Sequence, residues 1–249
     1  MAGHNKWSKI KRGKAITDAK RGNAFSKLAK EITLAAKSGG GNPDMNARLR
    51  SAITAAKAAN VPNDNIDRAI KKGTGELASA VLEEIVYEAY GPGGVAMMIE
   101  VVTDNRNRSA NDLRTLLSKN NGTFADAGSV AYMFQRRGEI RLDKSAATED
   151  QIMESALESG AEDIQEEGDD WVIYTSTEQL FQVGNALKER GFPPRSQGLI
   201  YQPQTTITIS DADTARSLIK LYDILDDYDD SQHVHANFEI DDTIAGQLD

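Results

Sequence analysis

Hydrophobic residues recur at helical spacing in the first third of the chain. The first predicted helix ends at the glycine run 39–41, because glycine commonly terminates a helix. A second helix fits residues 43–60, with Leu49 inward, and a short third helix fits residues 63–72. The pattern therefore predicts a small three-helix domain. The inward positions of the first helix are Phe25, Leu28, Ile32 and Ala35 or Ala36.

Alternating apolar and polar residues predict strands after this helical part. Residues 83–90 and 94–102 are strand-like and are joined by a glycine-rich hairpin turn. A helix is expected at 109–122, opened by a capping box that begins at Ser109. A further strand is predicted at 129–136. These elements form an incomplete α+β sandwich.

The stretch 138–203 has a complete pattern of its own. It reads strand, helix, strand, strand, helix, strand, which is the ferredoxin-like order. A strand at 205–210, a helix at 212–228 and a strand at 233–240 follow it. In the simplest assembly, these last elements return to finish the incomplete sandwich.

We therefore predict an α+β protein: an N-terminal three-helix domain plus two ferredoxin-like α+β domains, the third inserted into the second. The basic all-α domain with its flexible basic arm is expected at residues 1–76. The second domain is expected at 79–136 plus 204–241, and the inserted domain at 137–203.

Charge is divided unevenly between these parts. Residues 1–72 hold 16 Lys and Arg against 5 Asp and Glu, although the whole chain has a net charge of -9. Such asymmetry favours nucleic acid or an anionic surface as a partner. The acidic remainder would be repelled by nucleic acid and could bind a basic protein partner.

Composition excludes several other classes of protein. The chain has no cysteine, which rules out disulfides and thiolate chemistry and suits a reducing cytosol, so we expect a cytoplasmic protein. Its apolar runs are too short to predict a membrane span or a secretory signal. No nucleophile motif and no metal-ligand spacing is present, and the pair His233 and His235 alone is weak support for a metal. We predict no catalytic residues, no metal, no cofactor and no enzyme activity.

Candidate nucleic-acid-binding residues are concentrated in the arm and the first two helices. Trp7 lies between Lys6 and Lys9, where an indole suits stacking on an unpaired base or anchors the arm on the helical domain. Lysines of the first helix fall opposite its apolar stripe. An ordinary solvated basic face is the alternative. The predicted binding residues are Lys6, Trp7, Lys9, Lys11, Arg12, Lys14, Lys20, Arg21, Lys27, Lys30, Lys37, Arg48 and Arg50.

A second candidate is the loop of Asn105, Arg106, Asn107 and Arg108. It is expected between a strand end and a helix N-terminus, where free backbone N–H groups favour anions. Two arginines there could bind a phosphate bidentately. An ordinary polar loop before a capped helix is the alternative.

The acid run Asp226, Asp227, Asp229 and Asp230 follows the last predicted helix. Acids are mildly unfavourable at a helix C-terminus, so the run suggests a basic partner, unless it is a solvated turn.

Several long motifs closely resemble the YebC/PmpR family, and the match runs from residue 2 to about 241. The resemblance implies an all-α N-terminal domain followed by two α+β domains, the third inserted into the second. This sequence departs from the family's usual pattern at Asn121, where the family usually has a second glycine. The motifs are "AGHNKWSKIKRGKAITDAKRGNAFSKLAKEI", "AAKSGGGNPDMNARLRSAI", "YEAYGPGGVAMMIEVVTDNRNRS", "GSVAYMF" and "MESALESGAEDI". The family's basic motif maps onto Lys6, Trp7, Lys9, Lys11, Lys14, Lys20, Arg21 and Lys27, and its second motif onto Asn105, Arg106, Asn107 and Arg108.

The resemblance also implies function. Members are described as probable transcriptional regulators that bind promoter DNA in the cytoplasm, and related members act in translation on the ribosome, for example at proline runs. We expect a monomeric DNA-binding transcriptional regulator. A translation factor that contacts rRNA or tRNA is the alternative, and a protein-interaction scaffold is a third class. With no helix-turn-helix signature in the sequence, the choice between DNA and RNA stays open.

Overall fold

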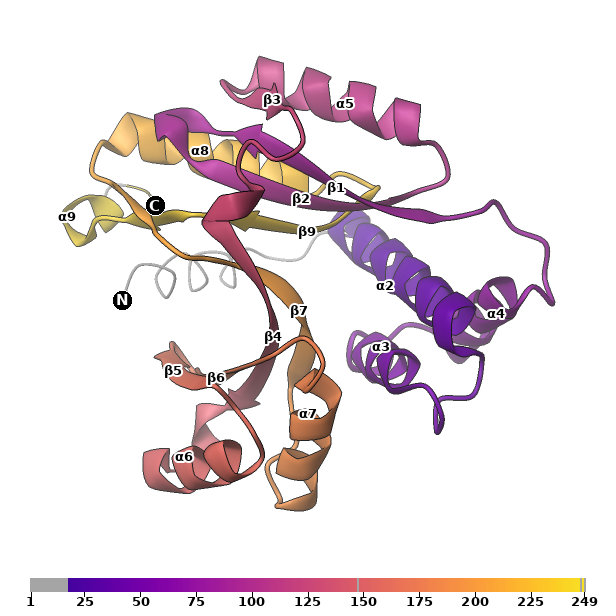
Figure 1. Cartoon of the computed structure of the whole chain (residues 1–249). Helices are drawn as coiled ribbons and strands as arrows, with labels where there is room; N and C mark the ends of the chain where they lie inside the picture. Colours follow the sequence, from indigo (N-terminus) through magenta and orange to yellow (C-terminus); the bar gives the residue numbers. More distant parts are fainter. Residues whose placement is uncertain (1–17, 147, 247, 249) are drawn as a thin grey trace. The chain divides into compact units, whose positions relative to one another are not determined.

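The structure is a computed structural model that describes residues 18–146, 148–246 and 248, with side chains from Gly22 onward except at Ala245. The described chain forms two compact units. The first unit contains residues up to 131 together with 213–236, and the second contains 132–212 together with residues from 237 onward. Each unit is described by itself below (Figure 1). The domain boundaries expected from the sequence stay a prediction.

Three helices begin the first unit: α2 (Asp18–Gly39), α3 (Ala47–Ala58) and α4 (Asn63–Thr74). Their shared core contains Ile32 and Leu49, both fully buried. The predicted inward positions of the first helix are confirmed: Ala35 and Ala36 are buried, and Phe25 and Leu28 are half-buried against the same core. The apolar positions predicted from helical spacing are therefore the ones that pack in the core of the three helices.

Two local features hold these helices close together. Asn46 caps α3 by accepting the N–H of Leu49 at 3.0 Å, and its amide donates to the carbonyl of Ala35 at 2.7 Å. At Gly73 a Cβ would lie 2.4 Å from the Thr33 carbonyl oxygen. Only glycine allows α4 to approach α2 this closely.

A four-stranded antiparallel sheet completes the first unit, with strand order β3-β1-β2-β9. Leu117 of α5 and Leu221 of α8 both reach Gly122, where a Cβ would lie 2.8 and 3.0 Å from their methyl carbons. The two helices therefore cover the same face of the sheet. The elements are β1 (Glu83–Tyr90), β2 (Ala96–Thr103), α5 (Arg106–Lys119), β3 (Thr123–Ala125), α8 (Ala212–Asp226) and β9 (Ser231–Ala236).

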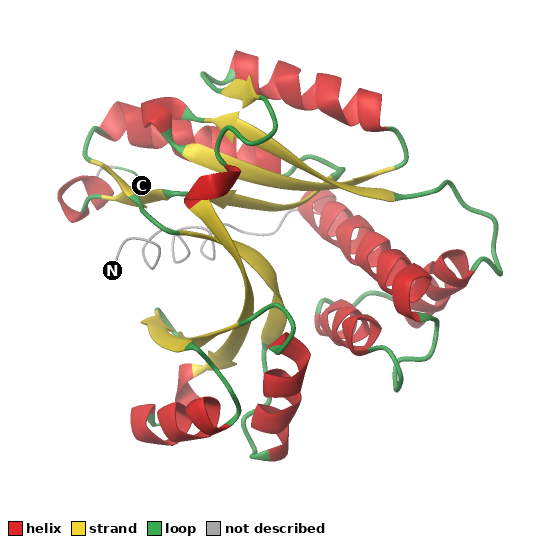
Figure 2. Ribbon diagram, viewed as in Figure 1, coloured by secondary structure: helices red, strands yellow, loops and turns green. Residues whose placement is uncertain are grey.

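The second unit contains another four-stranded antiparallel sheet, of order β5-β6-β4-β7, with helices on one face (Figure 2). This is the ferredoxin-like strand order predicted for 138–203. A two-stranded parallel sheet of β8 and β10 and a short helix α9 also belong to this unit. The elements are β4 (Phe134–Asp143), α6 (Glu149–Glu158), β5 (Asp163–Glu167), β6 (Asp170–Thr175), α7 (Leu180–Glu189), β7 (Ser196–Pro203), β8 (Ile207–Ile209), β10 (Phe238–Ile240) and α9 (Asp242–Ala245).

The protein is thus α+β, with an N-terminal helical region followed by sheet-containing domains. Two strand predictions were wrong in detail. The separate strands expected on either side of Gly138 are one strand, β4, preceded by a short 3-10 turn. At Gly138 a Cβ would lie 2.9 Å from the Cβ of Leu180. This glycine makes room for α7 and does not end a strand.

The single strand predicted at 233–240 is two strands. β9 pairs with β2 of the first unit, whereas β10 pairs with β8 in the second unit. The chain changes sheets at Asn237, whose carbonyl accepts the N–H of Ile207 at 2.7 Å. Apolar residues continue to alternate through this point, and all of them are buried, so alternation alone does not reveal the break. The predicted return to the first sheet is made by α8 and β9, and not by β8.

Gly73 offers a test of the helix packing. We expect Gly73→Ala to lower the free energy of unfolding by about 1–3 kcal/mol, because the added methyl overpacks the α2–α4 contact. The matched change Gly22→Ala, at an exposed helical position with open space around it, should instead stabilise by roughly 0.5–1 kcal/mol. Urea unfolding followed by circular dichroism measures both, and shifts of the same sign would contradict the packing described here.

Candidate nucleic-acid interface

The predicted residues of the arm lie outside the described chain. The same is true of the side chains of Lys20 and Arg21, whose backbone belongs to α2. Their role in binding stays a prediction. The arm residues concerned are Lys6, Trp7, Lys9, Lys11, Arg12 and Lys14.

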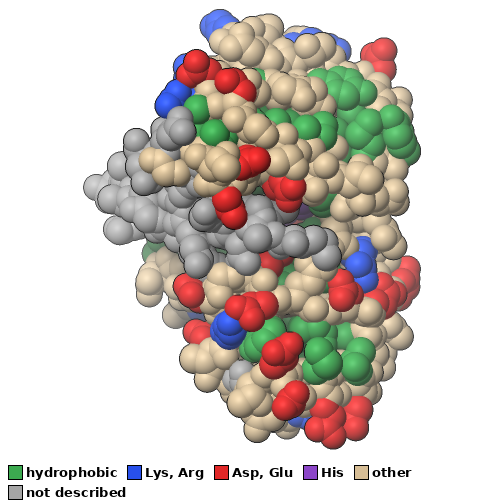
Figure 3. All heavy atoms as spheres, turned by 90° about the vertical axis from the view of Figure 1, so that its left-hand side faces the viewer, with side chains coloured by type: hydrophobic (Ala, Val, Ile, Leu, Met, Phe, Trp, Pro, Cys, Tyr) green, Lys and Arg blue, Asp and Glu red, His purple; other side chains and the backbone are tan. Residues whose placement is uncertain are grey.

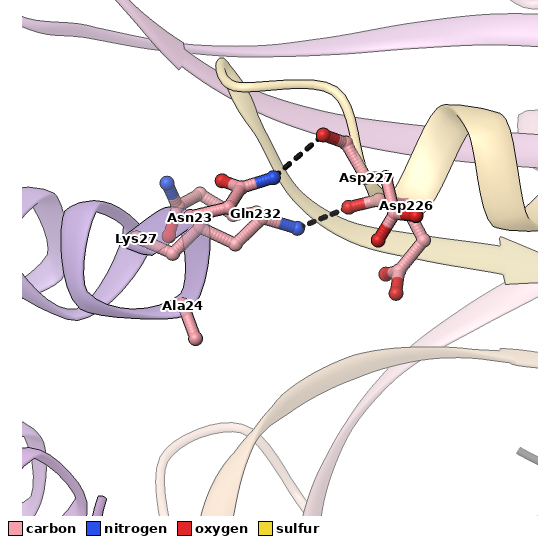
Figure 4. Close-up of a pocket in the computed structure, with 6 residues that line it drawn as sticks. All are labelled: Asn23, Ala24, Lys27, Asp226, Asp227 and Gln232. Carbon is pink, nitrogen blue, oxygen red and sulfur yellow. Dashed lines mark hydrogen bonds between the residues drawn. The ribbon is translucent and has the colours of Figure 1, made fainter. Parts of the chain in front are cut away.

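The first half of α2 contacts the C-terminal end of α8 (Figure 4). The Lys27 ammonium donates to the carbonyl of Asp226, and the Asn23 amide donates to the carbonyl of Asp227 at 2.5 Å. Carbonyl groups in the last turn of a helix lack intrahelical donors and lie at the negative end of its dipole. Lys27 therefore donates to a carbonyl at the end of α8. The sequence pattern had instead predicted that Lys27 binds phosphate.

Lys30 lies one turn further along α2 and is held by three oxygens. Its Nζ is 2.8 Å from Asp230 Oδ1, 2.8 Å from the carbonyl of Asp229 and 3.0 Å from the carbonyl of Val102. An ammonium group has three hydrogens to donate. All three have acceptors within the protein.

The other oxygen of the same carboxylate is held by a second group of donors. Asp230 Oδ2 accepts from Arg108 Nη2 at 2.8 Å, from Ser109 Oγ at 2.8 Å and from Thr103 Oγ1 at 3.1 Å. Tyr228 contributes a hydroxyl at 3.2 Å. The structure thus brings together Lys30 and Arg108, one from each predicted candidate group, on one acid.

The Asp230 side chain is only 9% exposed, which by itself disfavours its charged form. The hydrogen bonds from Lys30, Arg108 and Ser109 outweigh this burial and hold the pKa of Asp230 well below its usual range. Asp230 is therefore a buried, fully coordinated anion. The basic partner that the acid run suggested is, for this residue, the protein's own α2 and α5.

The second candidate loop is the beginning of α5. Asn105 is the N-cap: its Oδ1 accepts the N–H of Arg108 at 3.1 Å, and its own N–H donates to Thr103 Oγ1 at 3.0 Å. The capping box predicted at Ser109 was therefore wrong, because Ser109 lies buried in the first part of the helix and serves Asp230. Arg106 and Asn107 are exposed in the first turn.

Of the other predicted binding residues, some pair with groups of the protein and some are exposed. Arg48 binds Glu31 at 2.8 and 3.0 Å and also contacts Glu84, and these pairings raise its pKa, with the Glu31 hydrogen bond the largest cause. Arg50 donates to the carbonyl of Pro43 at 3.2 Å. Lys37 is exposed, and its ammonium lies 3.2 Å from the carbonyl of Leu82.

Sequence reasoning missed three cations on α4. Arg68, Lys71 and Lys72 are exposed, and no carboxylate of the described chain lies within salt-bridge distance of them. The signal was present for Arg68 and Lys71, which lie on the side of α4 away from the buried Ile66, whereas Lys72 lies one turn after Arg68 and beside Ala69. By contrast, acidic side chains are spread over the face drawn in Figure 3.

Other site types find little support in the described part of the chain. Among its residues no group of three or more His, Asp and Glu side chains could hold a metal ion. His235 pairs with Glu100 at 2.7 Å and is not grouped with further ligands. None of the described helices combines the length and apolarity that a membrane crossing requires.

Comparison with known proteins assigns this arrangement of domains to a family. Residues 5–76 match the model described as TACO1/YebC protein N-terminal domain, and residues 82–238 match the model described as TACO1/YebC second and third domain. The chain belongs to the TACO1/YebC family. Asn121, with a φ of 59°, adopts the left-handed conformation that glycine adopts without strain.

Similar proteins come from several bacteria. One from Akkermansia muciniphila, named probable transcriptional regulatory protein, is 53% identical over 251 residues and covers 100% of both chains. One from Myxococcus xanthus with the same name is 49% identical and covers 100% of this chain and 99% of the other. The crystal structure of a conserved hypothetical protein from Aquifex aeolicus superposes with a TM-score of 0.84 at 45% identity, covering 90% of this chain and 93% of that one.

The Asp230 cluster predicts a particular dependence of stability on pH. Asp230→Asn should lower the free energy of unfolding by about 3 kcal/mol near neutral pH, since it removes the buried charge that pairs with the half-buried Lys30 and the partly exposed Arg108. A carboxylate with a depressed pKa contributes its full stability above its unfolded pKa of about 3.9 and loses it as the pH falls toward the folded value. The difference in free energy of unfolding between wild type and variant should therefore be constant from about pH 5 to 8 and shrink below about pH 4. Urea unfolding across this range measures the difference, and a gap that widens in acid would contradict the assignment.

Substitutions of the two arginines in the second candidate loop, Arg106 and Arg108, should have different effects on stability and on nucleic-acid binding. Arg108→Gln should destabilise the protein, because Arg108 binds Asp230. Arg106→Gln should leave the thermal midpoint unchanged, because its guanidinium is exposed, and should weaken nucleic-acid binding by about twofold to fivefold if it contacts a phosphate. Thermal denaturation and filter binding give the two readouts, and equal affinity of Arg106→Gln and wild type would make this turn purely structural.

Proposed function

We propose that this protein is a cytoplasmic, non-enzymatic regulator of gene expression that binds nucleic acid through its N-terminal helical region, acting as a DNA-binding transcriptional regulator. One observation carries the proposal: the basic excess of residues 1–72 includes exposed cations on α4 that no carboxylate of the described chain neutralises. The names of the relatives, probable transcriptional regulatory protein, support a regulator.

Binding would be driven by phosphate contacts. Each phosphate that a Lys or Arg neutralises releases a condensed counterion, so affinity falls with salt at a slope of about −0.9 per contact on duplex and about −0.7 on single strands. The binding residues are the predicted arm and α2 positions together with Arg68, Lys71 and Lys72 of α4. Lys27, Lys30 and Arg108 would contribute chiefly by fixing the shape of the first unit.

The acidic remainder would remain off the polyanion. It carries 33 acidic side chains against 13 basic ones in residues 73–249, so it is repelled by phosphate and offers a surface to a basic protein partner. We propose a monomer, in which one basic region faces the nucleic acid and the sheet-containing domains are free for such a partner.

A second function is favoured by one further feature. The basic residues Arg68 and Lys72 of α4 border a groove between α2, α4 and the segment before β1. Part of its lining is apolar, which suits an unpaired nucleotide better than a base-paired one. This favours a translation factor that contacts rRNA or tRNA on the ribosome. Duplex promoter DNA would use the same cations without entering the groove.

The deciding experiment is crosslinking of the tagged protein in living cells, followed by stringent purification and sequencing of the attached DNA and RNA. Discrete promoter DNA with RNA at background would establish the transcriptional regulator. Ribosomal or transfer RNA with DNA at background would establish the translation factor.

Two matched variants sharpen this experiment. Lys9, Lys11 and Lys14 all changed to Gln should reduce crosslinking and lower the salt slope by about 2–3. The control changes three exposed lysines of the acidic part, Lys119, Lys188 and Lys220, to Gln and should have no effect. Equal losses of crosslinking in both variants would mean that charge in general, and not the basic arm, governs binding. Background levels of both DNA and RNA on the wild-type protein would reject nucleic-acid binding.

A further inference from the structure

A groove runs between α2, α4 and the segment that leads into β1. It has a volume of about 410 Å³, within the range of about 300–1,000 Å³ typical of ligand pockets. Its lining contains basic, apolar and uncharged polar residues and no acid, in a chain with 38 acidic side chains. The apolar residues are Phe25, Ala29, Val61, Ala69, Ala80 and Leu82.

Two exposed cations line one side of the groove. Arg68 and Lys72 are four residues apart on α4, so they project from the same face of the helix one turn apart. Lys30 also lines the groove, but its ammonium is bound to Asp230 and two carbonyls, so its methylene stem is what it offers there. The free positive charge of the groove is therefore on α4.

The apolar part of the lining, called the floor below, includes an aromatic ring. Phe25 is half-buried, packing on the helical core while bordering the groove. Leu82 is also half-buried, and Val61 is 6% exposed. A flat apolar group could rest on this floor while an attached anion reaches the cations.

We propose that this groove binds one unpaired nucleotide of a single-stranded nucleic acid, with its base against Phe25 and Leu82 and its phosphates on Arg68 and Lys72. The inference rests on the nucleic-acid binding of the proposed function and adds that the bound polymer has a single-stranded segment. A nucleotide combines a flat aromatic base with a phosphate of opposite charge to the groove, which matches both parts of the lining. In a duplex the base faces are stacked on their neighbours and cannot reach the floor.

The test compares binding of the full chain to a labelled single-stranded oligonucleotide and to a duplex of the same length. The variant Arg68→Gln with Lys72→Gln should bind the single strand about tenfold more weakly, with a salt slope reduced by about 1.4, as expected for two lost contacts. The control is Lys57→Gln with Lys119→Gln, which removes equal charge from exposed helical positions that do not line the groove. The control should retain nearly all single-strand affinity.

A second variant addresses the floor. Phe25→Leu keeps an apolar side chain of similar volume and removes the aromatic ring, so its thermal midpoint should stay near that of the wild type. We expect single-strand affinity to fall roughly tenfold, the cost of one lost base–aromatic stack, with the salt slope unchanged. Duplex affinity should not change.

The outcomes separate this inference from the proposed function. A wild-type protein that binds neither oligonucleotide would reject both. Wild-type binding with equal losses in the two double variants, or an unaffected Phe25→Leu, would overturn the groove and leave the proposed function standing. An acidic peptide with apolar side chains, tested as competitor, would overturn nucleic acid as the occupant if it bound more tightly and with the same variant dependence.

Discussion

The structure of the first unit depends on one buried carboxylate. An ionised side chain that is 9% exposed is tolerated only when hydrogen-bond donors replace its lost water, and Asp230 receives them from α2, from the end of β2 and from α5. These segments are far apart in the chain, and Asp230 itself follows α8. One acid therefore fixes the helical region against the first sheet and its covering helix, because removing any donor exposes the cost of the buried charge.

This constraint divides the basic residues into two classes. Lys30 and Arg108 are bound to a carboxylate inside the protein, so a phosphate would compete with Asp230 for them. Arg68 and Lys72 have no carboxylate within salt-bridge distance in the described chain, and a phosphate would meet no such competitor there. Net charge alone does not distinguish these classes. A basic face read from sequence thus overstates the number of cations available to a polyanion.

Much of the fold was predictable from local patterns, whereas the site was not. Ile32 and Leu49 follow from helical spacing, and the strand order of the second unit follows from its alternation of elements. The switch of sheets at Asn237 was missed because apolar alternation continues through it. The pairing of Lys30 with Asp230 joins residues 200 positions apart, and no local pattern encodes such a contact. Arg68 was predictable from its helix face, but no motif pointed to it.

Selectivity between polymers then depends on shape more than on charge. A duplex presents about one phosphate charge per 1.7 Å of its axis, so a purely electrostatic surface would prefer it to a single strand. In the proposed binding mode the apolar floor would reverse this preference, because only an unstacked base could cover Phe25 and Leu82 while its phosphates reach α4. The acidic remainder repels phosphate of either polymer, so the choice between them would rest with the groove. A small basic groove in an acidic protein would therefore select exposed single-stranded segments over the bulk of cellular duplex.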